Sequence, residues 1–444
     1  PPRLFNAGAI MNLQGVDDMA ETATSTIEKA LALNLDPLKY GTIVEIGAGQ
    51  EVARWFFRAG AAAGTVAKTM SAYDMKFSDE IYGTASDQRY VSRGRLERML
   101  EQEFDLVVSR IQDHRPDDST FFAFADTVAA QGFKTRAECH GWLGVRFQCE
   151  PRATPDEILI HVRMLDDTNL EQQEALGIVG VNLIHGAFFH RDNPAELLRS
   201  LVDGMKWGRV EIDLVEMRGP KLDAFDNRLL ALELVKASLA RAVLFDPDGK
   251  VVIPADALYK HRVLAMRGTY YTVEPTDIDM FTHAKMQFSA QHTDADSDIL
   301  CLAEMTMAQL ANDQNIDTGD FLARVNRLSE AGYYVLISEF FRYFRVSQYF
   351  SRYSREPAAI VTDLEGLGDI FREDYYEGLS GGILESLGQL FTRQTVLYVY
   401  PSGPSPDSGG SMQIDDLPIA DAMRPLLTYL MDRRQIVLID NYNF

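Results

Sequence analysis

The segment from Gly41 to Asp74 holds the densest clustering of glycine, small residues and charged side chains in the sequence. Thr42 to Ile46 has the apolar character of a short buried strand, Gly47-Ala48-Gly49 is typical of a tight turn, and Glu51 to Ala59 has one apolar helical face. A helix that begins after a glycine turn can bind an anionic group with its free amides. The sequence therefore predicts ligand-binding roles for Gly47, Gly49, Gln50 and Glu51.

The segment is similar to three known ligand motifs. It departs from each of them in a residue or a spacing that the chemistry of the motif requires. The dinucleotide motif G-x-G-x-x-G has its third glycine where Val52 stands. The opening turn of S-adenosylmethionine-dependent methyltransferases ends in a glycine, and Glu51 occupies that position. The phosphate loop G-x-x-x-x-G-K-[ST] differs in spacing from Gly60, Gly64 and Lys68. A packed turn with an ordinary helix cap is the alternative to a ligand site.

Carboxylates and a lysine in this part of the chain have the chemistry of proton carriers. Lys68 with Asp74, or Glu45 with Asp126, can transfer protons or supply oxygen ligands if the fold brings them together. Glu45 is the most informative, because a carboxylate inside an apolar strand must find a partner or change its pKa. A structural salt bridge to an arginine is the alternative. The candidate catalytic residues are Glu45, Lys68, Asp74 and Asp126.

Two arginines and an asparagine follow strands that are predicted further along the chain. Arg218 and Asn227 come after the strand Val210 to Val215, and Arg267 comes directly after Val263 to Met266. In a parallel sheet, ligands bind beyond the carboxyl ends of the strands. Arginines at such ends can hold a phosphate or carboxylate through two hydrogen bonds. Helix capping and salt bridges to the many acidic residues are the alternative.

Metal-binding and nucleophile motifs have little support. His185 and His190 are five residues apart, whereas two ligands on one helix are usually four apart. Cys139-His140 lacks a second close pair, and no predicted strand leads into a G-x-S-x-G nucleophile elbow. We predict no metal site, and the sequence identifies no cofactor.

The segment Glu339 to Arg355 combines seven aromatic residues with four arginines on a predicted helix. Such a surface can stack bases, receive an anionic ligand or bind another protein. The alternative is that the aromatic residues fill the core while the arginines extend to solvent. A protein partner through residues 339–355 is therefore one of our hypotheses, and the oligomeric state is left open.

The pattern of predicted strands and helices that must position these residues indicates an α/β protein. Residues 1–40 are predicted as a helical lead-in, and 41–166 as an α/β portion with a mixed or antiparallel sheet. Short apolar strands alternate with helices from 167 to 444, which predicts a Rossmann-like, doubly wound and mainly parallel sheet. Residues 401–416 are predicted as a flexible loop. We expect a boundary or change of layer near Asp166-Asp167, and further capping boxes at Thr168 and Thr362.

Composition narrows the possible partners. The 444 residues include 43 basic and 65 acidic residues, a net charge of -22, which disfavours duplex nucleic acid and anionic membranes as partners. The longest uncharged run, Ala175 to Phe189, is shorter than a membrane span and is predicted as a buried helix. Three cysteines without a regular framework favour a reducing, soluble compartment: the cytoplasm, or an organelle matrix or stroma if a targeting segment has been removed.

The chain also resembles a widespread family whose function is not established. The resemblance covers most of the chain and rests on the segments EIGAGQEVARWFFRAGAAAGTVAKTMSAYD, FADTV, GWLGVRFQ, QQEALGIVGVNLI, DNRLL and LYKHRVLAMRG. Members carry two conflicting labels, nicotinate-nucleotide adenylyltransferase and TonB-dependent receptor. The first needs an H-x-G-H signature, which none of the eight histidines forms. The second needs many alternating strands of about ten residues, which we do not find. The resemblance thus assigns no catalytic residue.

Two classes of function follow. The first is an enzyme that acts on a nucleotide or another phosphorylated or carboxylated small molecule, with the site around the glycine turn. The second is a noncatalytic subunit or scaffold of a larger protein complex, since no complete catalytic motif is present. An S-adenosylmethionine-dependent methyltransferase-like protein is a further alternative, because Glu45 to Glu51 follows that motif up to its last glycine.

Overall fold

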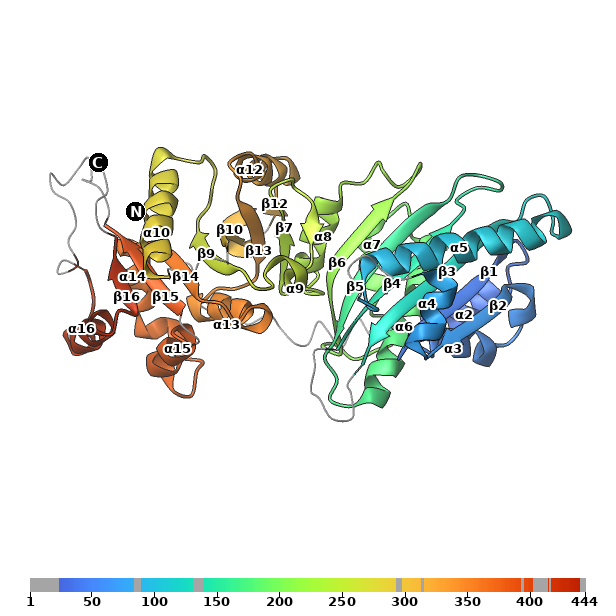
Figure 1. The fold of residues 1–444 in the computed structure, drawn as a ribbon, viewed down its shortest axis with the longest axis horizontal. Coiled ribbons are helices and arrows are strands. Elements are labelled where there is room, and N and C mark those ends of the chain that lie inside the picture. The colour runs from blue at the N-terminus through green and yellow to red at the C-terminus, as the bar shows by residue number, and fades with distance from the viewer. Residues whose placement is uncertain are drawn as a thin grey trace. The chain divides into compact units, whose positions relative to one another are not determined.

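The computed structural model describes residues 24–439, except for 84–88, 131–138, 293–297, 313–314, 393–394, 402–413 and 415–416. The chain forms two compact units (Figure 1), Pro1–Leu239 and Ala240–Phe444. We name them the N-terminal unit and the C-terminal unit. Each is built on a separate sheet, so each is described by itself.

The N-terminal unit contains a six-stranded sheet of β1 (Lys39–Gly47), β2 (Val66–Ala72), β3 (Thr120–Ala129), β4 (His140–Phe147), β5 (Asp156–Met164) and β6 (Val210–Arg218). The strand order is β2-β1-β3-β4-β5-β6. β1 runs parallel to β2 and β3, whereas the pairs from β3 to β6 are antiparallel. The sheet is therefore mixed, and all nine residues of β5 are buried.

Helices cover both faces of this sheet. They are α2 (Thr26–Asn34), α3 (Val52–Ala59), α4 (Met75–Tyr82), α5 (Arg93–Ile111), α6 (Asn169–Phe189), α7 (Pro194–Ser200) and α8 (Asn227–Lys236). Phe121 of β3 packs with Phe104 of α5, whereas the ring of Phe122 contacts that of Phe188 in α6 at 5.8 Å. Because successive residues of a strand point to opposite faces, α5 and α6 lie on opposite sides of the sheet. Both α2 and α3 pack against α6.

The helix α6 is the buried helix that the sequence predicts. The hydroxyl of Thr168 accepts a hydrogen bond from the amide of Glu171 at its first turn. A β-carbon on Gly180 would lie 2.4 Å from a side-chain carbon of Val52 in α3. Only glycine allows α3 to approach α6 this closely, so the packing of α6 fixes where the helix after the glycine turn lies.

The C-terminal unit contains an eight-stranded sheet of β7 (Ala242–Phe245), β8 (Val251–Val252), β9 (Arg262–Arg267), β10 (Ile299–Thr306), β13 (Tyr334–Ser338), β14 (Ala358–Asp363), β15 (Thr395–Tyr400) and β16 (Ile436–Leu438). The order is β16-β15-β14-β9-β10-β13-β7-β8. The six strands from β16 to β13 are parallel. β7 is antiparallel to β13, and β8 is antiparallel to β7.

The winding of this sheet reverses once among the parallel strands. From β9 the chain passes to β10 and β13 on one side, and then returns to β14 on the other side of β9 before it reaches β15 and β16. This is the strand order of the doubly wound nucleotide-binding folds, in which the reversal marks the ligand crevice. The crevice is expected where the carboxyl ends of β9 and β14 meet.

Two groups of helices sandwich this sheet (Figure 1). On one face lie α10 (Pro275–Gln291) and α12 (Thr318–Glu330), and on the other α13 (Tyr343–Tyr353), α14 (Leu364–Ile370), α15 (Gly382–Leu390) and α16 (Arg424–Asp432). Ring contacts join Phe288 of α10 to Tyr398 at 6.2 Å and Phe321 of α12 to Phe245 at 6.3 Å. The opposite face packs Ala265, Ile360 and Leu397 beneath α13 to α16.

These sheets confirm the predicted fold class, and they correct two local predictions. Residues 210–215, predicted in the parallel sheet, belong to β6, which is antiparallel to β5 because it completes the N-terminal sheet. Thr362 does not cap a helix, because β14 continues through Asp363, whose carboxylate accepts from the Gly366 amide at 2.8 Å. The change of layer expected at residues 166–167 falls between β5 and α6, inside the N-terminal unit. Residues 1–23 and most of 401–416 lie outside the described residues.

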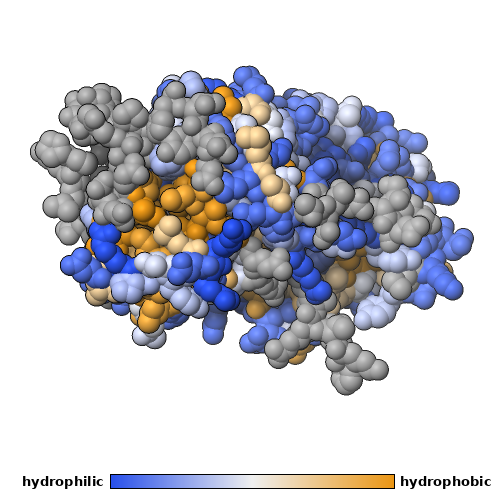
Figure 2. Space-filling view, turned by 60° about the vertical axis from the view of Figure 1, so that its left-hand side comes forward, coloured by the Kyte–Doolittle hydropathy of each residue, from blue (hydrophilic) through white to orange (hydrophobic). Residues whose placement is uncertain are grey.

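Figure 2 shows one face of the molecule, on which hydrophilic side chains predominate and apolar residues gather in one area. Large apolar side chains exposed on the C-terminal unit are Tyr259, Tyr271, Ile278, Met286, Phe341, Leu384 and Tyr429. Within the described parts of the chain, none of the helices has both the length and the apolar character of a membrane span.

Candidate functional site

The predicted glycine turn follows β1 and lies directly over a buried carboxyl group. Gly47 has a φ of 82°, which favours glycine, and the amide of Ala48 donates to the carbonyl of Val128 at 3.4 Å. A β-carbon on Gly49 would lie 2.6 Å from Oδ2 of Asp126. The two glycines thus let the backbone pack onto Asp126.

Glu45 uses its carboxylate to hold the first turn of α3. Oε1 accepts from the Val52 amide at 2.8 Å, and Oε2 accepts from the Ala53 amide at 3.2 Å. These are the amides that would receive an anionic ligand at the start of a helix. The protein's own carboxylate therefore occupies the position that the sequence predicted for a ligand.

Glu45 and Asp126 form a buried carboxyl pair on the adjacent strands β1 and β3, where they are register partners. Glu45 is 3% exposed and Asp126 is 0% exposed. Burial raises the pKa of Glu45 to about 7. Burial, and then the charge of Glu45, raise the pKa of Asp126 well above its usual range. Oδ1 of Asp126 accepts from the Ile46 amide at 3.2 Å, whereas Oδ2 is buried without a partner among the described atoms.

The other residues predicted around the turn make local structural contacts. The side-chain amide of Gln50 donates to the Gly47 carbonyl at 3.2 Å, and Glu51 pairs with Arg54 at 3.0 Å. Lys68 pairs with Glu103 of α5, and Asp74 caps α4. The fold brings Glu45, Gly47, Gly49 and Asp126 together, but it uses Lys68 and Asp74 elsewhere.

Arg218 and Asn227, the site residues predicted after the strand that is now β6, also make structural contacts. The guanidinium of Arg218 contacts Glu157 and Glu97, and the latter ion pair spans 2.8 Å. The side chain of Asn227 bonds both the amide and the carbonyl of Met217, so it holds the start of α8 against β6. Both residues thus link elements of the N-terminal unit.

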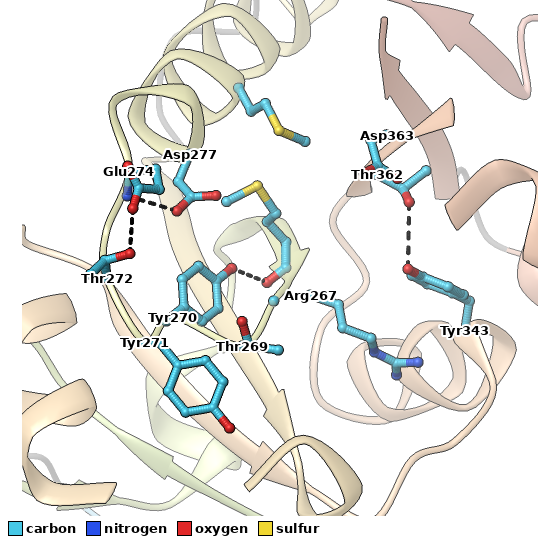
Figure 3. Close-up of a pocket in the computed structure, with 13 residues that line it drawn as sticks. Arg267, Thr269, Tyr270, Tyr271, Thr272, Glu274, Asp277, Tyr343, Thr362 and Asp363 are labelled. Atoms are coloured by element: carbon cyan, nitrogen blue, oxygen red, sulfur yellow. Dashed lines mark hydrogen bonds between the residues drawn. The ribbon is translucent and has the colours of Figure 1, made fainter. Parts of the chain in front are cut away.

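A pocket opens at the reversal point of the C-terminal sheet. Figure 3 shows it between the end of β9 and the start of α10 on one side and the end of β14 on the other. Its volume is ≈ 440 Å³, which lies in the usual range for small-molecule sites. The lining residues are Met266, Arg267, Gly268, Thr269, Tyr270, Tyr271, Thr272, Glu274, Asp277, Met280, Tyr343, Thr362 and Asp363. The pocket therefore lies where the strand order places a ligand.

Hydroxyl groups and carboxylates dominate the lining. The hydroxyl of Tyr270 donates to the Met266 carbonyl at 2.7 Å, and that of Tyr343 lies 3.4 Å from Thr362. Burial raises the pKa of Asp277, whose Oδ2 accepts from the Glu274 amide at 3.0 Å. The wall can accordingly accept hydrogen bonds from a ligand's hydroxyl or amino groups.

Arg267 is the one predicted site residue that lines this pocket, but its guanidinium is turned into the protein. Nε and Nη2 bond the carboxylate of Glu304 at 3.0 and 3.1 Å. The same group donates to the carbonyls of Phe340 and Phe341 at 2.8 and 3.0 Å and lies over the Tyr343 ring at 4.5 Å. Arg267 therefore lines the pocket while its guanidinium anchors the loop after β13.

Most of the pocket is contributed by α10 and the loop before it, which sequence reasoning did not single out. The sequence does contain a start signal, because Pro275 stands at the first helical position and Glu274 with Asp277 forms a capping box. Thr362 and Asp363 at the end of β14 line the pocket as well and were not predicted as site residues, although the rule on strand ends applies to them.

A second polar cluster crosses the antiparallel strands of the N-terminal unit. Nδ1 of His161 lies 2.5 Å from Asp213, and its Nε2 lies 3.0 Å from Nδ1 of His140. The register of β5 and β6 shifts at His161, and this β-bulge allows Asp213 to reach the histidine. The ring of Trp142 holds His161 at a centroid distance of 5.0 Å. The cluster orders the sheet, and sequence spacing gives no sign of it.

Two further predictions concern metals and protein partners. Among the described residues, no group of three or more His, Cys, Asp or Glu side chains is placed to hold a metal ion. In the segment 339–355, Phe344, Tyr349, Phe350 and Tyr353 are buried in the core of the C-terminal unit, whereas Phe341 is exposed. Most of its aromatic surface is therefore used for packing.

No family model matches the chain, and no curated protein matches it. Among solved structures, a competence/damage inducible protein, CihA from Agrobacterium tumefaciens, is 15% identical with a TM-score of 0.27 over 36% of this chain and 93% of its own. A competence or damage-inducible protein from Enterobacter asburiae is 14% identical, with a TM-score of 0.27 over 37% and 98%. A CinA superfamily protein from Enterobacter cloacae is 13% identical, with a TM-score of 0.27 over 42% and 98%. These values indicate a partial likeness in structure, from which we derive no function.

Proposed function

We propose that the C-terminal unit binds a nucleoside-type small molecule in the pocket between β9 and β14. The observation that carries the proposal is the position of the pocket at the carboxyl ends of the two strands between which the winding reverses. This is the place at which doubly wound sheets bind nucleosides and their derivatives.

The lining supports this class of ligand. Glu274, Asp277 and Asp363 supply carboxylate oxygens that can accept from ribose hydroxyls, as acidic residues do in related sites. The hydroxyl of Tyr343 remains protonated, because burial raises its pKa, and it can donate to a base or a ribose oxygen. Met266 and Met280 supply apolar surface for a flat ring.

The Glu45–Asp126 pair supports no equivalent proposal in the N-terminal unit. Both carboxyl groups are buried beneath the turn. The Val52 and Ala53 amides at the start of α3 already donate to Glu45 and are not available to a ligand. The enzyme hypothesis therefore moves to the C-terminal unit, where the first requirement is a bound small molecule.

Ligand binding can be tested with a substitution that closes the pocket. Thr269 is an exposed lining residue, so Thr269→Trp is expected to fill the entrance without disturbing the core. Isothermal titration of the full chain with adenosine, S-adenosylhomocysteine, NAD and ATP should show binding of at least one compound. The variant should weaken that binding by about tenfold or more, which corresponds to about 1.4 kcal/mol.

The matched control is Thr318→Trp, which places the same bulky residue on an exposed position of α12 outside the pocket lining. It should bind the same compound as the unaltered chain does. The proposal fails if neither these compounds nor S-adenosylmethionine binds, or if Thr269→Trp and Thr318→Trp change the affinity equally.

A further inference from the structure

The electrostatic character of the pocket indicates which nucleoside-type ligands it can accept, and this inference rests on the proposed function. Doubly wound folds usually bind a phosphate with the helix that follows their first parallel strand. The equivalent helix here is α10. At its start, Pro275 has no amide hydrogen, and the side chains of Glu274 and Asp277 form a capping box with each other's backbone amides. Two carboxylates thus stand where a phosphate would bind.

Arg267 does not compensate for these carboxylates. It is the only basic residue among the 13 that line the pocket. Its guanidinium forms two hydrogen bonds with Glu304 and two with backbone carbonyls, so its charge is already neutralised. A phosphate would therefore enter without an available cationic partner in this lining.

Three carboxylates, those of Glu274, Asp277 and Asp363, border the pocket. Figure 3 shows Glu274 and Asp277 on the α10 side, Asp363 across the pocket, and Arg267 directed toward Tyr343. Asp363 accepts a hydrogen bond from the Gly366 amide, and this bond satisfies only part of its accepting capacity. Because these carboxylates have no basic partner in the lining, the pocket attracts positive charge and repels anions.

We infer that the pocket selects a positively charged, unphosphorylated nucleoside derivative, such as one that carries a sulfonium or an ammonium group. Asp277 and Asp363 are the specificity-determining residues, since their carboxylates lie on opposite sides of the ligand space. The ribose hydroxyls of the same ligand can bond to Glu274 or to the threonine and tyrosine hydroxyls of the wall.

S-adenosylmethionine and S-adenosylhomocysteine are a suitable pair of probes, because they differ by one methyl group and one positive charge on sulfur. Titration of the full chain should show about tenfold tighter binding of S-adenosylmethionine, the effect of about one partly screened charge contact. This preference should decrease as NaCl is raised from about 0.05 to about 0.5 M, because the pocket is open to solvent. ATP and NAD should bind more weakly than adenosine.

Two isosteric variants assign the preference to the pocket. Asp277→Asn and Asp363→Asn keep the oxygen that accepts from the Glu274 and Gly366 amides, and asparagine is also a good helix cap. Each should reduce the affinity for S-adenosylmethionine by about three- to tenfold, with little effect on S-adenosylhomocysteine. The control is Asp421→Asn, which removes an exposed carboxylate outside the pocket and should leave both affinities unchanged.

The possible outcomes separate this inference from the proposed function. If ATP or NAD binds more tightly than adenosine, and Thr269→Trp blocks that binding, the pocket is a ligand site but its charge selectivity is the reverse of ours. Equal affinities for the two sulfur compounds would also overturn the inference. So would binding of MgCl₂ alone with the affinity of S-adenosylmethionine, because the pocket would then select any cation and not a nucleoside derivative. If no compound binds in a manner sensitive to Thr269→Trp, both the proposed function and this inference fail.

Discussion

Replacing Asp126 with asparagine is expected to stabilise the N-terminal unit at mildly alkaline pH by about 1–3 kcal/mol, because it removes a carboxyl group that must otherwise ionise in a buried position. The substitution requires no new contact, since the side-chain oxygen that accepts from the Ile46 amide is retained in the variant. The remaining carboxyl group, Glu45, keeps its two hydrogen bonds to α3.

The sign of the pH dependence follows from the direction of the pKa shifts. Glu45 and Asp126 both have raised pKa values in the folded protein, that of Glu45 reaching about 7. The folded state therefore binds more protons than the unfolded state between about pH 4.5 and 7, so that stability is highest at the acidic end and decreases as the pH rises. Asp126→Asn should flatten this decrease, since one of the two groups no longer titrates.

The measurement is thermal unfolding of the full chain by calorimetry at several pH values, together with hydrogen exchange of β1 and β3 amides to identify the N-terminal unit. The control is Asp105→Asn on the exposed side of α5, which changes the net charge equally. An Asp126→Asn variant that is as strongly pH-dependent as the unaltered protein, or less stable at about pH 8, would contradict this account.

The substitution Arg267→Met is expected to destabilise the C-terminal unit by about 3–5 kcal/mol, since it leaves a buried carboxylate without its cation. The side chains of Arg267 and Glu304 are 8% and 2% exposed, so solvent cannot replace the lost partner. Of the contacts around Glu304, the hydrogen bond from Ser338 at 2.6 Å would remain. One neutral hydroxyl does not balance a buried negative charge.

A double variant separates the charge effect from the loss of packing. Arg267→Met combined with Glu304→Met removes both charges, and we expect it to be more stable than Arg267→Met alone. The control Arg372→Met breaks an exposed ion pair with Asp374 in the same unit and should change stability little, because solvent screens exposed charges. Chemical denaturation followed by hydrogen exchange in β9 and β10 measures all three. A double variant no more stable than the single one would show that the guanidinium acts mainly through the Phe340 and Phe341 carbonyls.

The fold is largely predictable from the sequence, because its signals are local. The strands around Val263, Val335 and Ile360 are short and apolar and are separated by helices, which is the signature of a parallel sheet covered on both faces. The strand at Val210 has the same local signature. Its antiparallel pairing with β5 depends on the long connection between the two strands, so its sheet cannot be read from its own sequence.

The candidate sites are predictable only in part, because they depend on strand order and register. The sequence indicates that Glu45 needs a partner or a shifted pKa, and the structure gives it both. The sequence suggests Asp126 as a possible partner of Glu45, but the spacing of the two residues does not indicate that they are register partners on adjacent strands. The helix α10 was not singled out because few of its residues are buried, and without it the pocket at Arg267 cannot be located.

The bond from Glu45 to the first turn of α3 has a consequence for how this protein responds to dissolved anions. A group tethered to its binding position acts at an effective concentration of about millimolar or more, and so outcompetes a weak free ligand. Inorganic phosphate or sulfate at ordinary concentrations should therefore leave the N-terminal unit unchanged. Shortening this one side chain, for example by Glu45→Ser, would leave the Val52 and Ala53 amides without their partner.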